Sequence, residues 1–213
     1  MSARMTIATA TDGPAAKAAL TATEARECAL LAEAARRRDF RAGRLAAKRA
    51  AQADLHRSPC CRIEVVGDRD GAPELRLRDA LGGSRRVSRA LSLSHRDGHA
   101  VAVTAPSGTR IGVDLERAGS VQLSTVQELL TPFELEIAHE VDPTVIWSVK
   151  EAAWKALGLG TSVEFAEVEL RADPMGRLIG IDVLGAFVPM HTRIAEPWPG
   201  FICAKVWMTG GVA

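Results

Sequence analysis

The chain contains no tyrosine, and aromatic residues make up only 4% of its 213 residues. Its core must therefore be built from alanine, leucine, valine and isoleucine. The four cysteines have no CxxC spacing, which excludes the common zinc sites. No signal peptide or long apolar run is visible, so we expect a cytoplasmic protein with no membrane partner. The net charge of +1 offers no general attraction for nucleic acid, so we expect no nucleic-acid partner. Separately, we expect a monomer.

What the chain does have is an ordered pair of segments between residues 110 and 160. The first, RIGVDLERAG, predicts a short strand that leaves a turn. Because side chains alternate along a strand, Ile111, Val113 and Leu115 should lie on one face. Asp114 and Glu116 should then lie together on the other face. The strand therefore presents two carboxylates on the same side.

The second segment, WSVKEAAWKALGLG, predicts a helix. Asp142 is suited to the N-cap position, and Pro143 follows it at the first helical position. Gly158 is a signal for the end of this helix. Trp147, Glu151 and Lys155 stand at i, i+4 and i+8, so they share one stripe of this helix. A carboxylate and an ammonium thus face the same direction.

Three carboxylates and a lysine would meet if the strand packs against the helix. Asp114, Glu116 and Glu151 would place about three negative charges together, which is costly unless a cation neutralises them. Hard oxygen ligands suit Mg²⁺ or Mn²⁺, and magnesium keeps waters that substrate phosphates can replace. Lys155 and Lys150 would then face phosphate oxygens beside the metal. Taken singly, each segment is also compatible with an ordinary strand end and a solvated helix face.

Together the two segments resemble the paired signature of the 4'-phosphopantetheinyl transferases, GxDxE followed by WxxKEAxxKA. Both halves of the signature are complete, and the matching residues are Gly112, Asp114, Glu116, Trp147, Lys150, Glu151, Ala152, Lys155 and Ala156. The resemblance implies that Asp114, Glu116 and Glu151 hold the metal, and that Lys155 and Lys150 contact coenzyme A.

Two upstream stretches resemble the surfactin-synthetase type of this family. The first matches F-x-x-GR-x-A-x-K/R-x-A at Phe40, Gly43, Arg44, Ala46, Lys48 and Ala50. The resemblance implies that Arg44 and Lys48 bind the phosphates of the coenzyme, and arginine can bind phosphate oxygens bidentately. The second stretch, SLSH, resembles the family's xxSH motif. It implies that Ser94 and His95 lie at the mouth of the coenzyme site.

The expected fold class is α+β. Helices followed by strands occur twice along the chain, and surfactin-type enzymes are pseudo-dimers of two similar α+β halves with the coenzyme between them. We therefore expect an N-terminal half at residues 1–105, with residues 1–20 as a loose or partly ordered lead-in. A C-terminal half at residues 106–213 would carry the metal site.

The resemblance implies transfer of the phosphopantetheine arm of coenzyme A to a serine of an apo acyl or peptidyl carrier protein. Such carriers serve fatty acid, polyketide or nonribosomal peptide biosynthesis. The base that takes the serine proton is Glu151 as first choice, with Glu116 and Glu134 as alternatives. A non-catalytic coenzyme A-binding protein and a metal-dependent nuclease are the competing hypotheses. The carrier is expected to dock near residues 120–140 through apolar side chains, because this acidic segment has no Lys or Arg. The expected apolar contacts are Val126, Leu129, Leu130 and Phe133.

Overall fold

The computed structural model describes residues 5–52, 55, 58–67, 71–158 and 164–208, which fall into two units. The N-terminal unit comprises residues 1–108 and the C-terminal unit residues 109–213. Each unit combines helices with small antiparallel sheets, so the predicted α+β class is confirmed. The sequence placed the division between residues 105 and 106. That the two halves act as one pseudo-dimer stays a prediction.

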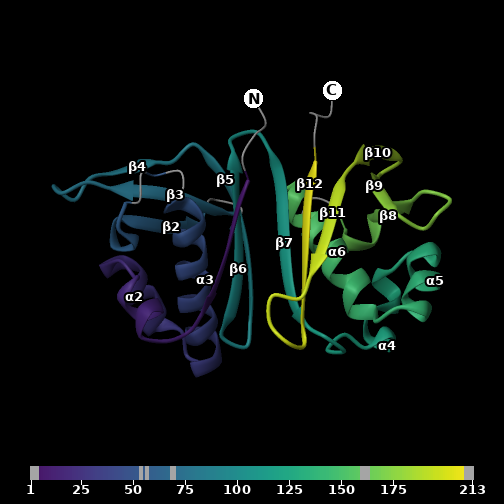
Figure 1. Ribbon diagram of the computed structural model, residues 1–213, viewed down its shortest axis with the longest axis horizontal. Helices are drawn as coiled ribbons and strands as arrows, with labels where there is room; N and C mark the ends of the chain where they lie inside the picture. The colour runs from purple at the N-terminus through teal and green to yellow at the C-terminus, as the bar shows by residue number, and fades with distance from the viewer. Residues whose placement is uncertain (1–4, 53–54, 56–57, 68–70, 159–163, 209–213) are drawn as a thin grey trace. The chain divides into compact units, whose positions relative to one another are not determined.

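The N-terminal unit contains one long helix and two three-stranded sheets (Figure 1). In chain order its elements are β1 (Thr6–Thr11), α1 (Pro14–Ala18), α2 (Ala22–Leu30), α3 (Ala34–Gln52), η1 (Cys60–Arg62), β2 (Ile63–Gly67), β3 (Pro73–Arg78), β4 (Ser84–Arg86), β5 (Arg89–Arg96) and β6 (His99–Pro106). The strand order is β1-β6-β5 in one sheet and β2-β3-β4 in the other. The long helix α3 packs on β6, β1 and β5.

The C-terminal unit also contains one long helix and two three-stranded sheets (Figure 1). In chain order its elements are β7 (Arg110–Arg117), α4 (Leu123–Val126), η2 (Gln127–Leu129), α5 (Pro132–Glu140), α6 (Pro143–Leu157), η3 (Phe165–Glu167), β8 (Val168–Ala172), β9 (Leu178–Val183), β10 (Ala186–Pro189), β11 (His191–Ala195) and β12 (Phe201–Met208). The strand orders are β7-β12-β11 and β8-β9-β10, and the long helix α6 packs on β7 and β12.

The two units therefore repeat one topology. Each begins with a strand that pairs with the last strand of its own unit, β1 with β6 and β7 with β12. Each then has a short helix, a second helix and a long helix, followed by a three-stranded meander and a closing hairpin. The sequence predicted helices before strands in each half, but the pairing of the first strand with the last one could not be read from it.

The helix ends follow local capping chemistry. The Asp142 carboxylate accepts a hydrogen bond from the backbone N–H of Thr144 at 2.9 Å, which confirms it as the N-cap of α6. Gly158 ends this helix in the left-handed conformation, at φ 65°. Thr21 and Thr131 begin α2 and α5, and each forms a capping box with a glutamate three residues later.

Residues 1–20 were expected to form a loose or partly ordered lead-in, and the described part is more ordered than that. Residues 6–11 form β1, which pairs in antiparallel register with β6 from Thr6 opposite Thr104 to Thr11 opposite His99. Residues 14–18 then form α1. The sequence TIATAT has small side chains and a weak pattern, so its strand depends on a partner about ninety residues away.

The core of each unit follows the composition. On α3 the buried face is mostly alanine, which lets the helix approach its sheets closely: Ala42, Ala46, Ala47, Ala50 and Ala51. The core of the C-terminal unit gathers aliphatic residues of α6, β8, β9 and β12. Among the described residues, no helix is both long and apolar enough to cross a membrane.

Candidate active site

Strand β7 and helix α6 pack unusually close together, and this close approach occurs at Gly112. A Cβ atom on Gly112 would lie 1.8 Å from the carbonyl oxygen of Ala152 and 2.9 Å from the backbone nitrogen of Ala156. Real Cβ atoms do not approach other atoms so closely, so only glycine allows the helix backbone to rest on the strand here. The face of β7 that carries Gly112 therefore points at α6. Asp114, two residues further along, lies on this same face.

Asp114, Glu151 and Lys155 meet where β7 and α6 pack together. The Lys155 ammonium donates to the Asp114 carboxylate at 2.7 Å and lies 3.2 Å from the Glu151 carboxylate. It also donates to the backbone carbonyl of Val113 at 3.4 Å. Asp114 is only 1% exposed, whereas the side chains of Lys155 and Glu151 are 29% and 30% exposed. The cluster is thus anchored in the interior and open to solvent on one side.

The electrostatics of this cluster favour a shared proton or cation. Burial raises the pKa of Glu151 to about 7, and the neighbouring Asp114 adds to the rise while Lys155 opposes it. Burial by itself would lower the pKa of Lys155, but attraction from Asp114 and Glu151 raises it above its usual value. Lys155 therefore stays charged near neutral pH, and Glu151 exchanges its proton in that range.

Asp114 and Glu151 are chemically suited to bind magnesium. Asp114 and Glu151 are hydrogen-bonding neighbours, and magnesium commonly binds one or two protein carboxylates while waters and substrate phosphates complete its shell. Within the described ranges, no group of three or more His, Cys, Asp or Glu side chains is arranged to hold a metal ion. The three-carboxylate set of Asp114, Glu116 and Glu151 stays a prediction.

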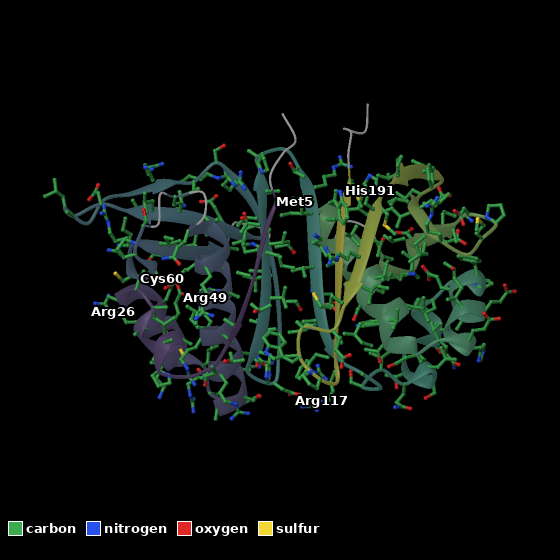
Figure 2. The ribbon with its side chains drawn as sticks, viewed as in Figure 1. Met5, Arg26, Arg49, Cys60, Arg117 and His191 are labelled. Atoms are coloured by element: carbon green, nitrogen blue, oxygen red, sulfur yellow. The ribbon has the colours of Figure 1, made fainter. Side chains whose placement is uncertain are left out.

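Glu116 lies one step further along the same face of β7. Its carboxylate accepts a hydrogen bond from the Ser120 hydroxyl at 3.3 Å. The strand ends at Arg117, labelled in Figure 2, whose guanidinium lies 5.1 Å from the centre of the Phe201 ring on β12. The structure thus places Glu116 on the predicted face, with its own partner in the following turn.

Lys150 differs from the expectation that it faces phosphate. Its side chain is 0% exposed, and its ammonium donates to the equally buried Glu134 carboxylate at 2.6 Å. Glu134 also accepts from the backbone N–H groups of Thr131 at 2.9 Å and Leu170 at 2.8 Å. The structure therefore assigns Lys150 to an internal ion pair. Glu134, buried with its oxygens engaged, is removed from the candidate bases.

Lys48 of the N-terminal unit also forms a buried ion pair, as Lys150 does. It is fully buried on α3, and its ammonium donates to the Glu24 carboxylate and to the backbone carbonyl of Ala19 at 2.6 Å. The family resemblance implied that Lys48 binds coenzyme phosphate, but in the structure its side chain points inward. A coenzyme phosphate has no access to it in this conformation, so we do not retain Lys48 among the binding residues.

Arg44 is held at the edge of the same cluster. Its guanidinium lies 3.7 Å from Glu24 and 3.8 Å from Glu27, and it covers the Phe40 ring with its central carbon 4.2 Å from the ring centre. Burial lowers the pKa of Arg44, while the two carboxylates oppose this effect. The positive charge of Arg44 is therefore partly balanced by Glu24 and Glu27. Its contact with coenzyme phosphate stays a prediction.

Ser94 and His95 lie at the end of β5, next to α3. Ser94 is buried and His95 is exposed. The His95 ring packs on Gly43, where an added Cβ would lie 3.3 Å from its Cδ2 atom. Its Nδ1 atom is 3.8 Å from the Asp39 carboxylate. Gly43, which the sequence offered only as a signature residue, thus makes room for the histidine, and Asp39 is a neighbour that sequence reasoning missed.

The internal glutamate–lysine pairs were also missed, although a sequence signal existed. Thr21-x-x-Glu24 and Thr131-x-x-Glu134 both have the capping-box pattern that precedes a helix. The pattern predicts a glutamate that turns back to its own helix start, which removes it from the surface. It does not reveal which lysine reaches that glutamate from another helix.

Comparison with known proteins identifies the segment that carries this cluster. Residues 110–196 match the model of the 4'-phosphopantetheinyl transferase superfamily. This segment, less than half of the chain, is therefore similar to that superfamily. The matched segment includes Asp114, Glu151 and Lys155. The match does not distinguish the surfactin-synthetase type, which stays a prediction.

Two further comparisons complete the picture. No curated protein matches the chain significantly. Among solved structures, the crystal structure of Thermotoga maritima holo-[acyl-carrier-protein] synthase (AcpS) is 21% identical, covering 64% of this chain and 90% of its own, with a TM-score of 0.37. We draw no conclusion from a likeness of this degree.

Proposed function

We propose that this protein is a phosphopantetheinyl transferase that moves the 4'-phosphopantetheine arm of coenzyme A to a serine hydroxyl of an apo acyl or peptidyl carrier protein. The products are the holo carrier protein and adenosine 3',5'-bisphosphate. The observation that carries the proposal is the Lys155 ammonium held between Asp114 and Glu151, in a segment that matches the superfamily. The cytoplasmic location and the monomeric state stay predictions from the sequence.

The reaction is a phosphoryl-group displacement. The serine oxygen forms a bond to the phosphorus that bears the pantetheine arm. The bond from that phosphorus to the bridging oxygen breaks, and adenosine 3',5'-bisphosphate leaves with the electron pair. Lys155 would stabilise the negative charge that develops on the phosphate oxygens, because a fixed ammonium needs no reorganisation as the charge moves. Its two carboxylate contacts hold it in place for this role.

The serine hydroxyl must lose its proton as it attacks. Glu151 is suited to accept it, since it lies at the open side of the cluster and changes charge near neutral pH. Glu116 is the alternative base, as it shares the strand face with Asp114. Asp114, fully buried and in contact with Lys155, orients the ammonium rather than meeting the carrier.

Magnesium is the proposed metal, and manganese is a substitute with the same ligand preference. Asp114 and Glu151 would hold it, with Glu116 as a further carboxylate on the same face. When bound, the ion neutralises charge on the pyrophosphate oxygens and on the leaving phosphate. Arg44, Ser94 and His95 are the proposed contacts to the coenzyme.

The proposal is tested by intact mass spectrometry of apo carrier proteins incubated with the protein, coenzyme A and magnesium. We expect a mass gain of one phosphopantetheine group on at least one carrier. A carrier whose target serine is replaced by alanine serves as the matched control and should gain nothing. Cleavage of DNA or RNA without carrier modification would instead favour the nuclease. Binding of coenzyme A without transfer to any carrier would favour the non-catalytic protein.

A further inference from the structure

The Glu134–Lys150 pair connects three elements of the C-terminal unit. Glu134 lies in the first turn of α5, Lys150 lies in the middle of α6, and the N–H group of Leu170 lies on β8. The Glu134 oxygens accept from Lys150 at 2.6 Å and from Leu170 at 2.8 Å, and they also close the capping box at Thr131. All these bonds converge on one carboxylate that water does not reach.

Burying two charges is expensive, and a buried ion pair adds little to stability compared with apolar residues of similar volume. Packing alone would therefore not favour Glu134 and Lys150 at these positions. The pair instead fixes the rotation of α6 about its axis, because hydrogen bonds between fixed partners form at only one rotation of the helix. A leucine pair would tolerate small rotations that this pair does not.

The rotation of α6 matters because Lys150 is followed directly by Glu151. Successive residues of a helix are separated by about 100°, so fixing the direction of Lys150 also fixes the direction of Glu151. At a side-chain radius of about 5–6 Å, a rotation of about 20° would move the carboxylate by about 2 Å. Glu151 and Lys155 move together on α6, so their own contact would persist. The contact of Lys155 to Asp114 on β7, at 2.7 Å, would not survive such a displacement.

The N-terminal unit contains an equivalent buried glutamate–lysine pair, Glu24 and Lys48, without the acidic cluster. Glu24 closes the capping box of α2, pairs with the buried Lys48 of α3 and accepts from the N–H group of Val65 on β2 at 3.0 Å. The three elements correspond in order to α5, α6 and β8. The long helix that this pair fixes carries Arg44, which lies 3.7 Å from Glu24. The chain therefore offers a matched control for any substitution in the Glu134–Lys150 pair.

We propose that Glu134 and Lys150 are positioning residues that set the rotation of α6, so that Glu151 and Lys155 meet Asp114 in the reactive arrangement. The inference rests on the proposed transferase function, because it explains how the catalytic cluster is held. Neither residue touches the substrate, and both act through the helix. The distance between β7 and α6 is set separately, by the close approach at Gly112.

The test compares Glu134→Gln with Glu24→Gln, two substitutions that remove the same charge from the same kind of pair. Thermal melting should show a similar loss of stability in both. We expect Glu134→Gln to lower kcat about tenfold to a hundredfold, because displacement by 1 Å can cost about a hundredfold, while the KM for coenzyme A stays within about threefold. Glu24→Gln should raise the KM for coenzyme A through Arg44, with kcat within about threefold of the wild type. Equal changes of kcat in the two variants would overturn the proposal.

Lys150→Arg supplies a rescue. It keeps the ion pair with Glu134, so its kcat should exceed that of Lys150→Met by at least about tenfold, and equal kcat values would contradict a positioning role. Should Glu134→Gln fail to fold, the neutral double variants Glu134→Gln/Lys150→Met and Glu24→Gln/Lys48→Met replace the single ones. They leave no lone buried charge.

Crystal structures of the two glutamine variants provide a readout that needs no activity. The contact between the Lys155 ammonium and the Asp114 carboxylate, 2.7 Å in the wild type, should lengthen beyond hydrogen-bonding distance in Glu134→Gln and persist in Glu24→Gln. An unchanged contact in Glu134→Gln would refute the positioning role. A wild-type protein inactive towards every carrier would refute the proposed function instead, and the crystal structures would still decide this inference.

Discussion

Replacement of Gly112 by alanine should disrupt the packing of β7 on α6 that holds the catalytic cluster. The added Cβ would lie 1.8 Å from the Ala152 carbonyl oxygen and 2.9 Å from the Ala156 nitrogen. Both are backbone atoms of α6, so no side chain can rotate away to make room. To reach an ordinary separation of about 3.2 Å from the oxygen, the helix or the strand must shift by about 1.4 Å. Lys155 and Asp114 lie on the two elements that must separate.

The loss of folding stability in Gly112→Ala has two contributions. Overpacking of a tightly packed contact costs about 1–3 kcal/mol, and the weakened contact between Lys155 and Asp114 adds about 1.5–3 kcal/mol as a charge-assisted hydrogen bond. A total of about 2.5–6 kcal/mol is a large part of the usual stability of a domain. For a chain of this size it should lower Tm by about 10 °C. Activity below Tm should fall about a hundredfold, because the cluster is displaced by more than 1 Å.

Calorimetry and single-turnover transfer, both at magnesium saturation, measure the two effects. Gly13→Ala is the control, since a Cβ there meets nothing within 4 Å and its backbone is extended. It should leave Tm and kcat close to those of the wild type. If Gly112→Ala also retains the Tm and kcat of the wild type, then α6 does not rest on β7 as described, and the geometry of the candidate site is wrong.

Four further outcomes can be checked. Asp114→Ala and Glu151→Ala should each abolish transfer while circular dichroism stays native, and turnover like that of the wild type at saturating magnesium would show that the metal lies elsewhere. Because the folded pKa of Glu151 is about 7, above its ordinary 4.5, the metal-free folded protein holds a proton that the unfolded chain releases. The free energy of unfolding should therefore fall by about 1–2 kcal/mol as pH rises from 4.5 to 7.5, after discounting for partial exposure, and Glu151→Gln should remove this slope in urea titrations. Arg44→Ala and His95→Ala should raise the KM for coenzyme A about tenfold to a hundredfold, as each loses a charge-assisted bond; unchanged affinity in both by calorimetric titration would exclude them from the site. Leu129→Asp, at a leucine 38% exposed in the acidic segment, should raise the carrier KM, which in the wild type should vary little with salt; a steep salt dependence with no response to the substitution would place carrier docking elsewhere.

The Leu129 prediction revises one made from sequence alone. Leu130 and Val126 were expected among the apolar residues that meet the carrier, but both are buried in the C-terminal core. A charged residue at either position would unfold the segment rather than report on docking. Helical periodicity shows which residues are apolar, yet in a short, broken helix it does not show which of two faces is covered.

Features that depend on neighbours along the chain were predicted well. The limits of α6 follow from Asp142, Pro143 and Gly158, which act within one turn of the helix ends. Each of these is a local interaction whose partners are close in sequence.

Features that depend on distant partners were not predicted. From the sequence, Lys48 and Lys150 would be expected to face solvent or phosphate. In the structure each donates to a buried glutamate, 24 residues away for Lys48 and 16 residues away for Lys150. Strand β1 forms because β6 completes its hydrogen bonds. Whether a lysine points to solvent or into the protein depends on which helix packs against its own, and the one-dimensional pattern does not contain that information.

The sequence by itself determined the chemistry of this protein: which acids and lysines occur at signature spacing, where the helices begin and end, and that Asp114 shares a strand face with Gly112. Only the tertiary structure decided which of those groups act together. It brought Lys155 to Asp114 and Glu151, turned Lys150 and Glu134 towards each other, and showed that Gly112 is required because a helix backbone rests on it. The physical reason is that charge and spacing are properties of the chain, whereas burial and contact arise only when separate elements pack together.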